Sequence, residues 1–250
     1  MLKVQHLSVS FVTRMGASKA VDNVTFSVES GKITAIIGES GSGKSVACCS
    51  LLGLIPSPPG LIEGGRALFD GKDLLKLNEA QLRKIRGRDI AMVFQDPMTC
   101  LNPYMTIGDQ LTESLRYHQK IRRAEARRRA IELLKEVGIR EPASTIDSYP
   151  HQFSGGMRQR VMIAMALINE PKLLIADEPT TALDVTIQAQ ILQLLADLQK
   201  RRDIGILFIS HDLAVIADIA DQIVVMQEGK VVETGSRSEI FHNAQHPYTQ

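Results

Sequence analysis

The chain begins with two segments in which apolar and polar residues alternate, Val4–Phe11 and Val21–Val28. A period of two residues is typical of half-buried strands in an antiparallel sheet. The short, mostly apolar run Ile33–Ile37 follows and leads into glycine-rich sequence, after which Val46–Leu54 contains no helix breaker before Gly53. We expect a buried strand, a loop and a helix in this order.

Strand-like runs disappear between Met98 and Ile168, where charged segments with helical spacing predict a helical insertion. Beyond it, short apolar runs again alternate with helical segments. The predicted strands are Lys172–Ala176, Ile206–Ile209 and Ile223–Met226, and the predicted helices are Thr186–Lys200 and Leu213–Ala220. Alternating strands and helices favour an α/β fold in which helices cover a mostly parallel sheet.

Composition narrows the class of protein. The 250 residues are 44% hydrophobic, enough for a sizeable core, and 29 Lys and Arg nearly balance 28 Asp and Glu. The longest apolar run, Val161–Ile168, is far below the roughly 20 residues that cross a bilayer. We therefore expect a chain that neither spans a membrane nor is exported. Its three cysteines lack C-x-x-C spacing, which favours neither a disulfide framework nor a zinc site and suits a reducing cytoplasm.

The glycine-rich sequence after the first buried strand matches the pattern G-x-x-x-x-G-K-[ST] of a phosphate-binding loop. Its residues are Gly38, Glu39, Ser40, Gly41, Ser42, Gly43, Lys44 and Ser45. Glycines let backbone amides approach phosphates, the following helix N-terminus favours their charge, and the lysine adds a cation. Its final serine supplies a hydroxyl ligand for Mg²⁺. We expect a nucleotide and Mg²⁺ to bind here.

Polar side chains follow three other apolar runs. Asp177 and Glu178 end the run that begins at Lys172, which suits Asp177 to hold Mg²⁺ and Glu178 to polarise an attacking water. The same two acids would also suit the start of a helix, and the pattern alone leaves both interpretations open. His211 and Gln95 follow the other runs, and the predicted roles are contact with the γ-phosphate for His211 and with metal or water for Gln95. Taken singly, neither of these two residues carries a function.

A second anion-binding helix start is predicted at Ser154, Gly155 and Gly156, followed by Met157, Arg158 and Gln159. With the phosphate loop, Gln95, the Asp177–Glu178 pair, Ala182-Leu183-Asp184 and Ser210-His211-Asp212, it forms six ordered motifs. In this order the motifs resemble the ATPase subunits of ABC transporters over essentially the whole chain.

The resemblance implies a single P-loop nucleotide-binding domain over residues 1–250, with an N-terminal antiparallel β region. Its core would comprise about residues 1–97 and 170–250, and a helical subdomain about residues 98–169. Two ATPase subunits, identical or homologous, would enclose ATP between the phosphate loop of one and Ser154–Gln159 of the other, with Asp184 at their interface. Phe11 is the candidate for adenine stacking, and Met15 is a nearby alternative.

Finer motifs resemble the oligopeptide, dipeptide and nickel importer ATPases: Phe94-Gln95-Asp96-Pro97-Met98, Tyr149-Pro150-His151-Gln152 and His246-Pro247-Tyr248-Thr249. Import of dipeptides or oligopeptides is the favoured function, with nickel or another solute as the alternative. The implied partners are two integral membrane permeases and an extracytoplasmic solute-binding protein, and the implied location is the cytoplasmic face of the inner membrane.

Two other functions stay open as alternatives: a soluble ABC ATPase acting on nucleic acid, and a regulatory module that binds ATP without hydrolysis. The basic run Arg122–Arg129 lacks aromatic residues for base stacking and includes Glu125, which favours a solvated helix face over a nucleic-acid site. We expect no nucleic-acid partner.

Overall fold

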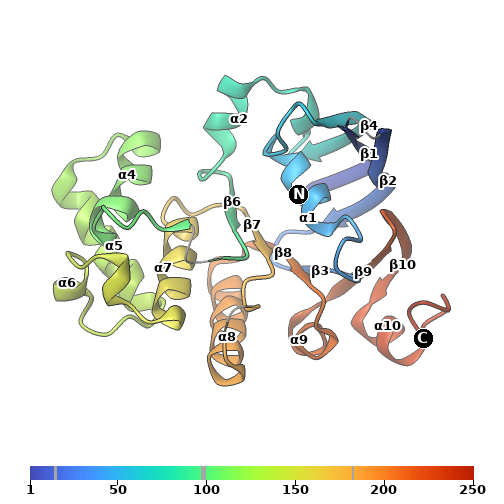
Figure 1. Ribbon diagram of the computed structural model, residues 1–250. Helices are drawn as coiled ribbons and strands as arrows, with labels where there is room; N and C mark the ends of the chain where they lie inside the picture. The colour runs from blue at the N-terminus through green and yellow to red at the C-terminus, as the bar shows by residue number, and fades with distance from the viewer. Residues whose placement is uncertain (14–15, 97–99, 182) are drawn as a thin grey trace. The chain divides into compact units, whose positions relative to one another are not determined.

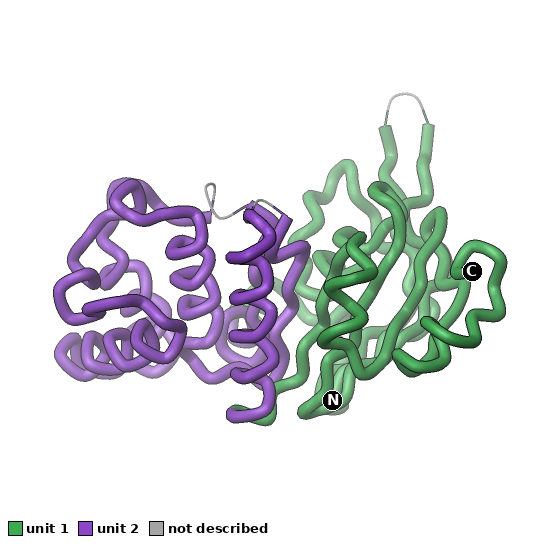
Figure 2. Tube along the Cα trace, turned by 90° about the horizontal axis from the view of Figure 1, so that it is seen from below, with its two compact units in different colours: residues 1–83, 202–250 green, residues 84–201 purple. Residues whose placement is uncertain are grey.

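A computed structural model describes residues 1–13, 16–96, 100–181 and 183–250 of the chain. The described residues form two compact units, shown in different colours in Figure 2. Unit 1 contains residues 1–83 and 202–250, and unit 2 contains residues 84–201. Of the residues named in the motifs above, Met15, Pro97, Met98 and Ala182 lie outside the described residues.

Unit 1 contains an antiparallel sheet with the strand order β2-β1-β4-β5. Its strands are β1 (Leu2–Thr13), β2 (Gly16–Val28), β4 (Gly60–Phe69) and β5 (Lys72–Asp73). Both predicted strands are observed. Leu2, Val4, Leu7 and Val9 of β1 have no exposed surface, and Val24, Phe26 and Val28 of β2 are buried, while register shifts interrupt the expected period of two in β1. Inward and outward side chains alternate along a strand, so this sheet buries one face against the core of the unit.

A second group of strands in unit 1 has β3 (Ile33–Ile37) between two parallel neighbours, β8 (Gly205–Ser210) and β9 (Gln222–Gln227). All residues of β3 are buried, as expected for a parallel strand covered on both faces. β10 (Lys230–Ser236) pairs with β9 antiparallel and was not predicted. The remaining elements of the unit are α1 (Lys44–Leu51), the 3₁₀ turn Leu74–Lys76, α9 (Leu213–Ile219) and α10 (Arg237–His242) (Figure 1). Helix α2 (Glu79–Ile85) spans the division between the units.

Unit 2 combines two parallel strands, β6 (Ile90–Val93) and β7 (Leu173–Asp177), with most of the helices. The helices are α4 (Ile107–Gln119), α5 (Arg123–Glu136), α6 (Pro142–Thr145), the 3₁₀ turn Pro150–Gln152, α7 (Gly155–Leu167) and α8 (Val185–Arg202). The helical insertion expected after Met98 is therefore confirmed. Fully buried leucines, among them Leu111, Leu115 and Leu134, form its core. Among the described residues, no helix combines the length and the apolar character needed to cross a bilayer.

Candidate functional site

The predicted phosphate loop connects β3 to α1 in unit 1, in the strand–loop–helix arrangement that was expected. Its glycines adopt backbone angles that other residues rarely take, with φ of 153° at Gly38 and 93° at Gly43. A Cβ atom at Gly38 would collide with the carbonyl oxygen of Met226, and one at Gly43 with that of Ala20. Glycine is therefore required at both positions, and the backbone of the loop lies close to its surroundings.

Lys44, the first residue of α1, is buried inside this loop. Its Nζ donates hydrogen bonds to the carbonyl oxygens of Gly38 at 2.7 Å and Glu39 at 2.8 Å. The carbonyl of Glu39 also accepts the amide N–H of Ser42 at 3.2 Å. The loop is thus closed around the lysine at a helix N-terminus, which concentrates positive charge where a phosphate would bind.

Two of the predicted side chains in unit 2 meet directly. Gln95 follows β6 and Glu178 follows β7, and these parallel strands pair with Val93 opposite Ala176. The Gln95 side-chain nitrogen donates to a carboxylate oxygen of Glu178 at 3.0 Å. The Thr181 hydroxyl donates to the same oxygen at 3.0 Å, a contact that the sequence analysis did not predict. These bonds orient the Glu178 carboxylate.

The adjacent acids at the end of β7 have different surroundings. Asp177 is buried as the last residue of the strand, whereas Glu178 is half-buried and has the left-handed backbone angle φ 46°. The alternative that both acids begin a helix is wrong, because α8 starts only at Val185. Asp184, the residue before α8, caps that helix instead, because its carboxylate accepts the amide N–H of Ile187 at 3.0 Å.

The predicted second anion-binding segment lies at the start of α7. Ser154 is its N-cap residue, and its hydroxyl accepts the amide N–H of Met157 at 3.3 Å. Ser154 and Gly155 are exposed, and Gly156 faces α8, where an added Cβ would lie 2.7 Å from Cγ2 of Ile187. The helix start therefore presents backbone amides at the surface of unit 2.

The prediction that Gln159 contacts nucleotide is corrected by its burial. The side chain has no exposed surface, and neither atom of its amide has a hydrogen-bond partner among the described residues. A fully buried side chain cannot touch a ligand held by another chain. Only Ser154, Gly155 and Gly156 of this segment stay in the candidate site.

Phe11 and His211 both lie in unit 1, and their positions do not test the roles predicted for them. Phe11 is half-buried in β1 opposite Gly60 of β4. His211 is exposed directly after β8, and Asp212 next to it caps α9 by accepting the amide N–H of Ala214 at 2.9 Å. Adenine stacking by Phe11 and γ-phosphate contact by His211 stay predictions.

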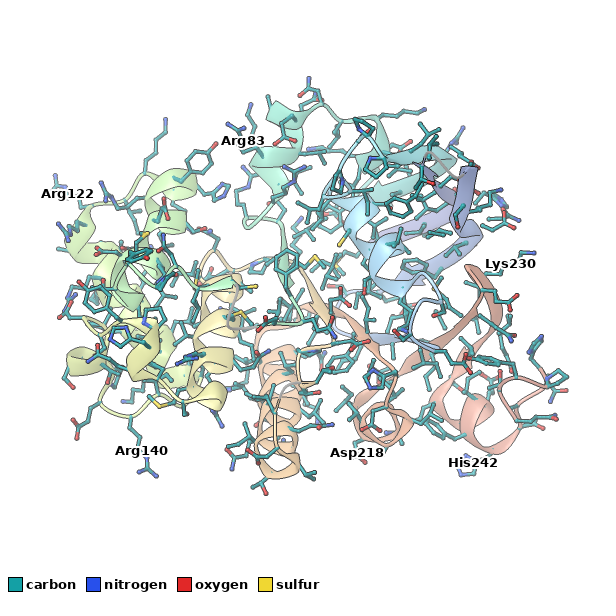
Figure 3. All side chains as sticks on the ribbon, viewed as in Figure 1. Arg83, Arg122, Arg140, Asp218, Lys230 and His242 are labelled. Atoms are coloured by element: carbon teal, nitrogen blue, oxygen red, sulfur yellow. The ribbon has the colours of Figure 1, made fainter. Side chains whose placement is uncertain are left out.

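The basic run in α5 is an ion-paired helix face. The Arg127 guanidinium donates to both oxygens of Asp147, at 2.7 and 2.6 Å, and this bond lowers the pKa of the Asp147 carboxyl. Arg128 and Arg129 donate to Glu125, whose pKa is lowered for the same reason. Arg122, before this helix, points outward from the unit (Figure 3). Carboxylates thus already engage most of this charge, as expected for a solvated face.

Could the described residues hold Mg²⁺? The candidate ligands are the Ser45 hydroxyl, the Asp177 carboxylate and the Gln95 amide oxygen. Mg²⁺ prefers such hard oxygen ligands, bound through one or two carboxylates together with substrate phosphates. Each of these donors, Ser45 in unit 1 and Gln95 and Asp177 in unit 2, thus has the chemistry that suits the ion. The loop of unit 1 suits a phosphate, which defines a nucleotide-binding protein of the P-loop class.

Comparison with known proteins narrows this class. Residues 21–181 match the ABC transporter family. The chain is 55% identical over 249 residues to the oligopeptide transport ATP-binding protein OppD of Bacillus subtilis (strain 168), with 100% of this chain and 70% of that protein covered. It is 52% identical over 250 residues to the dipeptide transport ATP-binding protein DppD of Escherichia coli (strain K12), with 100% and 76% covered. The chain therefore belongs to the ABC transporter family, as one of its ATPase cassettes.

A solved structure supports the same conclusion at the level of the fold. The dimeric post-hydrolysis state of the ATP-binding cassette MJ0796, bound to ADP and Pi, has a TM-score of 0.84 and 29% identity. The match covers 95% of this chain and 99% of that one. The predicted α/β fold, with its antiparallel N-terminal region and parallel strands, is confirmed.

Proposed function

We propose that this chain hydrolyses ATP to drive the import of dipeptides or oligopeptides through membrane-spanning partner subunits. The observation that carries the hydrolytic part is the hydrogen bond from Gln95 to Glu178, because it holds in a fixed orientation a carboxylate suited to polarise water. The transport part is supported by the relatives named as oligopeptide and dipeptide transport ATP-binding proteins.

The phosphate loop, residues 38–45, binds the phosphates of ATP in this proposal. Its backbone amides and the N-terminus of α1 receive the negative charge, and Lys44 contributes a cation. Phe11 stacks on the adenine. Phosphate binding by the loop is supported by the collisions that a side chain at Gly38 or Gly43 would cause. Only glycine lets the backbone follow this path.

Ser45, Asp177 and Gln95 are the residues that would hold Mg²⁺. When bound, the ion neutralises charge on the phosphate oxygens. The Gln95 nitrogen donates to Glu178, so its amide oxygen is the atom available to a metal. Gln95 would then link the metal to the carboxylate that acts on water.

Glu178 orients a water molecule for attack on the γ-phosphorus, in line with the bond to the leaving ADP oxygen. The new bond joins the water oxygen to phosphorus, a proton of that water passes to the Glu178 carboxylate, and the bond to the ADP oxygen breaks, so that the products are ADP and phosphate. His211 contacts the transferred γ-phosphate. The Thr181 hydroxyl is a positioning group, because it fixes the same Glu178 oxygen that Gln95 contacts.

A second ATPase subunit, identical or homologous, completes the site in this proposal. The exposed start of α7 at Ser154, Gly155 and Gly156 provides anion-binding amides that one phosphate loop does not need. It would contact the ATP held by the other subunit, with Asp184 at the interface. The dimeric form of the structural neighbour MJ0796 supports this arrangement.

The full transporter would also contain two integral membrane permeases and an extracytoplasmic solute-binding protein. The ATPase would then lie at the cytoplasmic face of the inner membrane. An importer for nickel or another solute is the alternative within the family. A nucleic-acid partner is disfavoured by the carboxylates that pair with Arg127, Arg128 and Arg129.

The hydrolytic proposal is tested with Glu178→Gln, which keeps the size of the side chain and removes its charge. We expect ATP binding to persist while kcat falls by about 10²- to 10⁴-fold, the usual contribution of a general base. Glu113→Gln, on the exposed face of α4, is the matched control and should leave turnover unchanged. Undiminished hydrolysis by the Glu178 variant would refute the role given to this carboxylate.

The solute is tested by reconstituting the ATPase with its permeases and binding protein in liposomes. We expect dipeptides or oligopeptides to stimulate ATP hydrolysis and to accumulate inside. Stimulation by nickel and not by peptides would establish the alternative importer. An ATPase stimulated by RNA or DNA in a salt-sensitive way would instead place the chain outside transport.

A further inference from the structure

The segment that follows α10, residues 243–250, forms the C-terminal end of the described chain (Figure 1). A carboxylate of β10 fixes it. Glu233 accepts the amide N–H of Gln245 at 2.8 Å on one oxygen and that of His246 at 3.1 Å on the other. Donation by the Gln245 amide is the main reason that the pKa of Glu233 lies below its ordinary value. The segment is therefore an ordered part of unit 1.

A tight turn within this segment sets the direction of Tyr248. The carbonyl of His246 accepts the amide N–H groups of Thr249 at 2.9 Å and Gln250 at 3.2 Å. The His246 ring nitrogen Nδ1 accepts the amide N–H of Tyr248 at 3.2 Å. These bonds hold the backbone on both sides of the tyrosine, whose ring extends from this turn.

The Tyr248 hydroxyl reaches the phosphate loop. Its oxygen accepts the backbone N–H of Glu39 at 3.1 Å, across 209 positions of sequence. Glu39 is the residue whose carbonyl accepts Lys44 at 2.8 Å and the Ser42 amide at 3.2 Å. Both backbone polar groups of Glu39 are thus engaged, the amide by Tyr248 and the carbonyl by the loop itself.

We propose that Tyr248 is a positioning residue for the phosphate loop. Its hydroxyl takes up the Glu39 amide and so holds the first turn of the loop in the conformation that encloses Lys44. The residue acts through the backbone of Glu39, whose amide its hydroxyl accepts. The proposal rests on the loop binding nucleotide and is independent of the transported solute.

The consequence is a preorganised loop. Without the hydroxyl, the Glu39 amide must find water or another acceptor, and the loop samples conformations that bind phosphate less well. Binding then includes the cost of ordering the loop, which lowers the apparent affinity by the fraction of molecules in the competent state. One neutral hydrogen bond is worth about a three- to tenfold change in an equilibrium constant.

The test is Tyr248→Phe, which removes the hydroxyl and keeps the ring. We expect the Kd for Mg²⁺-ADP, measured by calorimetry, to rise about three- to tenfold. The KM for ATP should rise by a similar factor while kcat changes little, because the missing bond is the same in ground and transition states. Tyr104→Phe, which alters a ring 90% exposed in unit 2, is the matched control and should change none of these values.

Hydrogen exchange supplies a readout that general destabilisation would not reproduce. In Tyr248→Phe the amide of Glu39 should exchange faster, while those of β3 keep their protection. A second variant, Glu233→Gln, weakens the anchor of the segment and should raise the Kd in the same direction. Because both variants act through one contact, the double variant should be less than additive.

An unchanged Kd and unchanged exchange at Glu39 in Tyr248→Phe would overturn the proposal. So would a fall in kcat with no change in Kd or KM, since that would assign the hydroxyl to the chemical step. Each of these results is distinct from a failure of peptide import, because ADP binding is measured on the ATPase subunit alone.

Discussion

Gln159 offers a sharp test of how the start of α7 is built. Its side chain is fully buried, and its Nε2 and Oε1 atoms have no partner among the described residues. A buried polar group without a hydrogen bond costs about 1–3 kcal/mol. Replacing the amide with an apolar side chain of similar size should therefore stabilise the protein.

Methionine is the replacement of choice, because it is unbranched, similar in volume and adaptable to the cavity that the glutamine leaves. We expect Gln159→Met to raise the free energy of unfolding by about 1–3 kcal/mol. For a chain of this size, each kcal/mol corresponds to about 2–4 °C in Tm, so a shift of about 2–12 °C is expected. Thermal unfolding without nucleotide measures it.

The control is Gln193→Met, on the exposed face of α8, where the stability should change by less than about 0.5 kcal/mol. ATP hydrolysis by Gln159→Met should stay near that of the parent, because a buried side chain does not touch nucleotide. A lower Tm would mean that the amide has a buried water or another partner, and the reasoning would fail. Lost hydrolysis with a raised Tm would restore Gln159 to the functional site.

Two further predictions concern unit 2. Gly156→Ala places a Cβ 2.7 Å from Ile187, and such overpacking should lower the free energy of unfolding, measured in urea, by about 1–3 kcal/mol. Adding Ile187→Ala should restore part of this stability. If it restores none, the strain lies elsewhere. Asp147→Asn should slightly lower Tm at neutral pH. The pKa of this carboxyl is below its ordinary value of 3.8, so its stabilising effect is present above that pH and is lost as the pH falls through the folded value. Parent and variant should therefore converge in acid, and a Tm gap that is constant with pH would contradict the ion pair with its arginine.

Burial made β3 predictable from the sequence, whereas β4 and β10 could not be predicted from their own patterns. β3 was predicted with its observed bounds because every one of its residues is buried. β10 was missed because none of its residues is fully buried, so no apolar period marks it. β4 was missed for a related reason, since its middle, residues 61–66, is exposed. Both strands are specified by their partners in the sheet and not by their own pattern.

Helix bounds depended on backbone conformation that periodicity does not reveal. The helix expected over Val46–Leu54 is α1, which runs from Lys44 to Leu51. It begins earlier because Gly43, with φ 93°, turns the chain directly into the helix. It ends earlier because Gly53, with φ 61°, is left-handed, which the helix cannot continue through.

In the candidate site, residues within short motifs could be proposed from the sequence, whereas contacts between distant residues could not. Motifs pointed to candidate residues such as Lys44 and Glu178 because each motif consists of a few neighbouring positions. Contacts across the sequence could not be found this way, since Gln95 and Glu178 are 83 positions apart. Tyr248 was noticed only as part of a family motif, although its hydroxyl contacts the phosphate loop.

The backbone of Glu178, a residue named by a motif, has a conformation that only the structure reveals. A left-handed conformation costs a residue other than glycine about 1–2 kcal/mol, so something must hold it. Helix capping is not the reason, because Asp184 caps α8. The bonds from Gln95 and Thr181 fix the side chain on this turned backbone, while Asp177 before it stays buried. The unfavourable angle at Glu178 therefore places the two adjacent carboxylates in different surroundings. Such a separation is needed if Asp177 binds a metal ion and Glu178 acts on water.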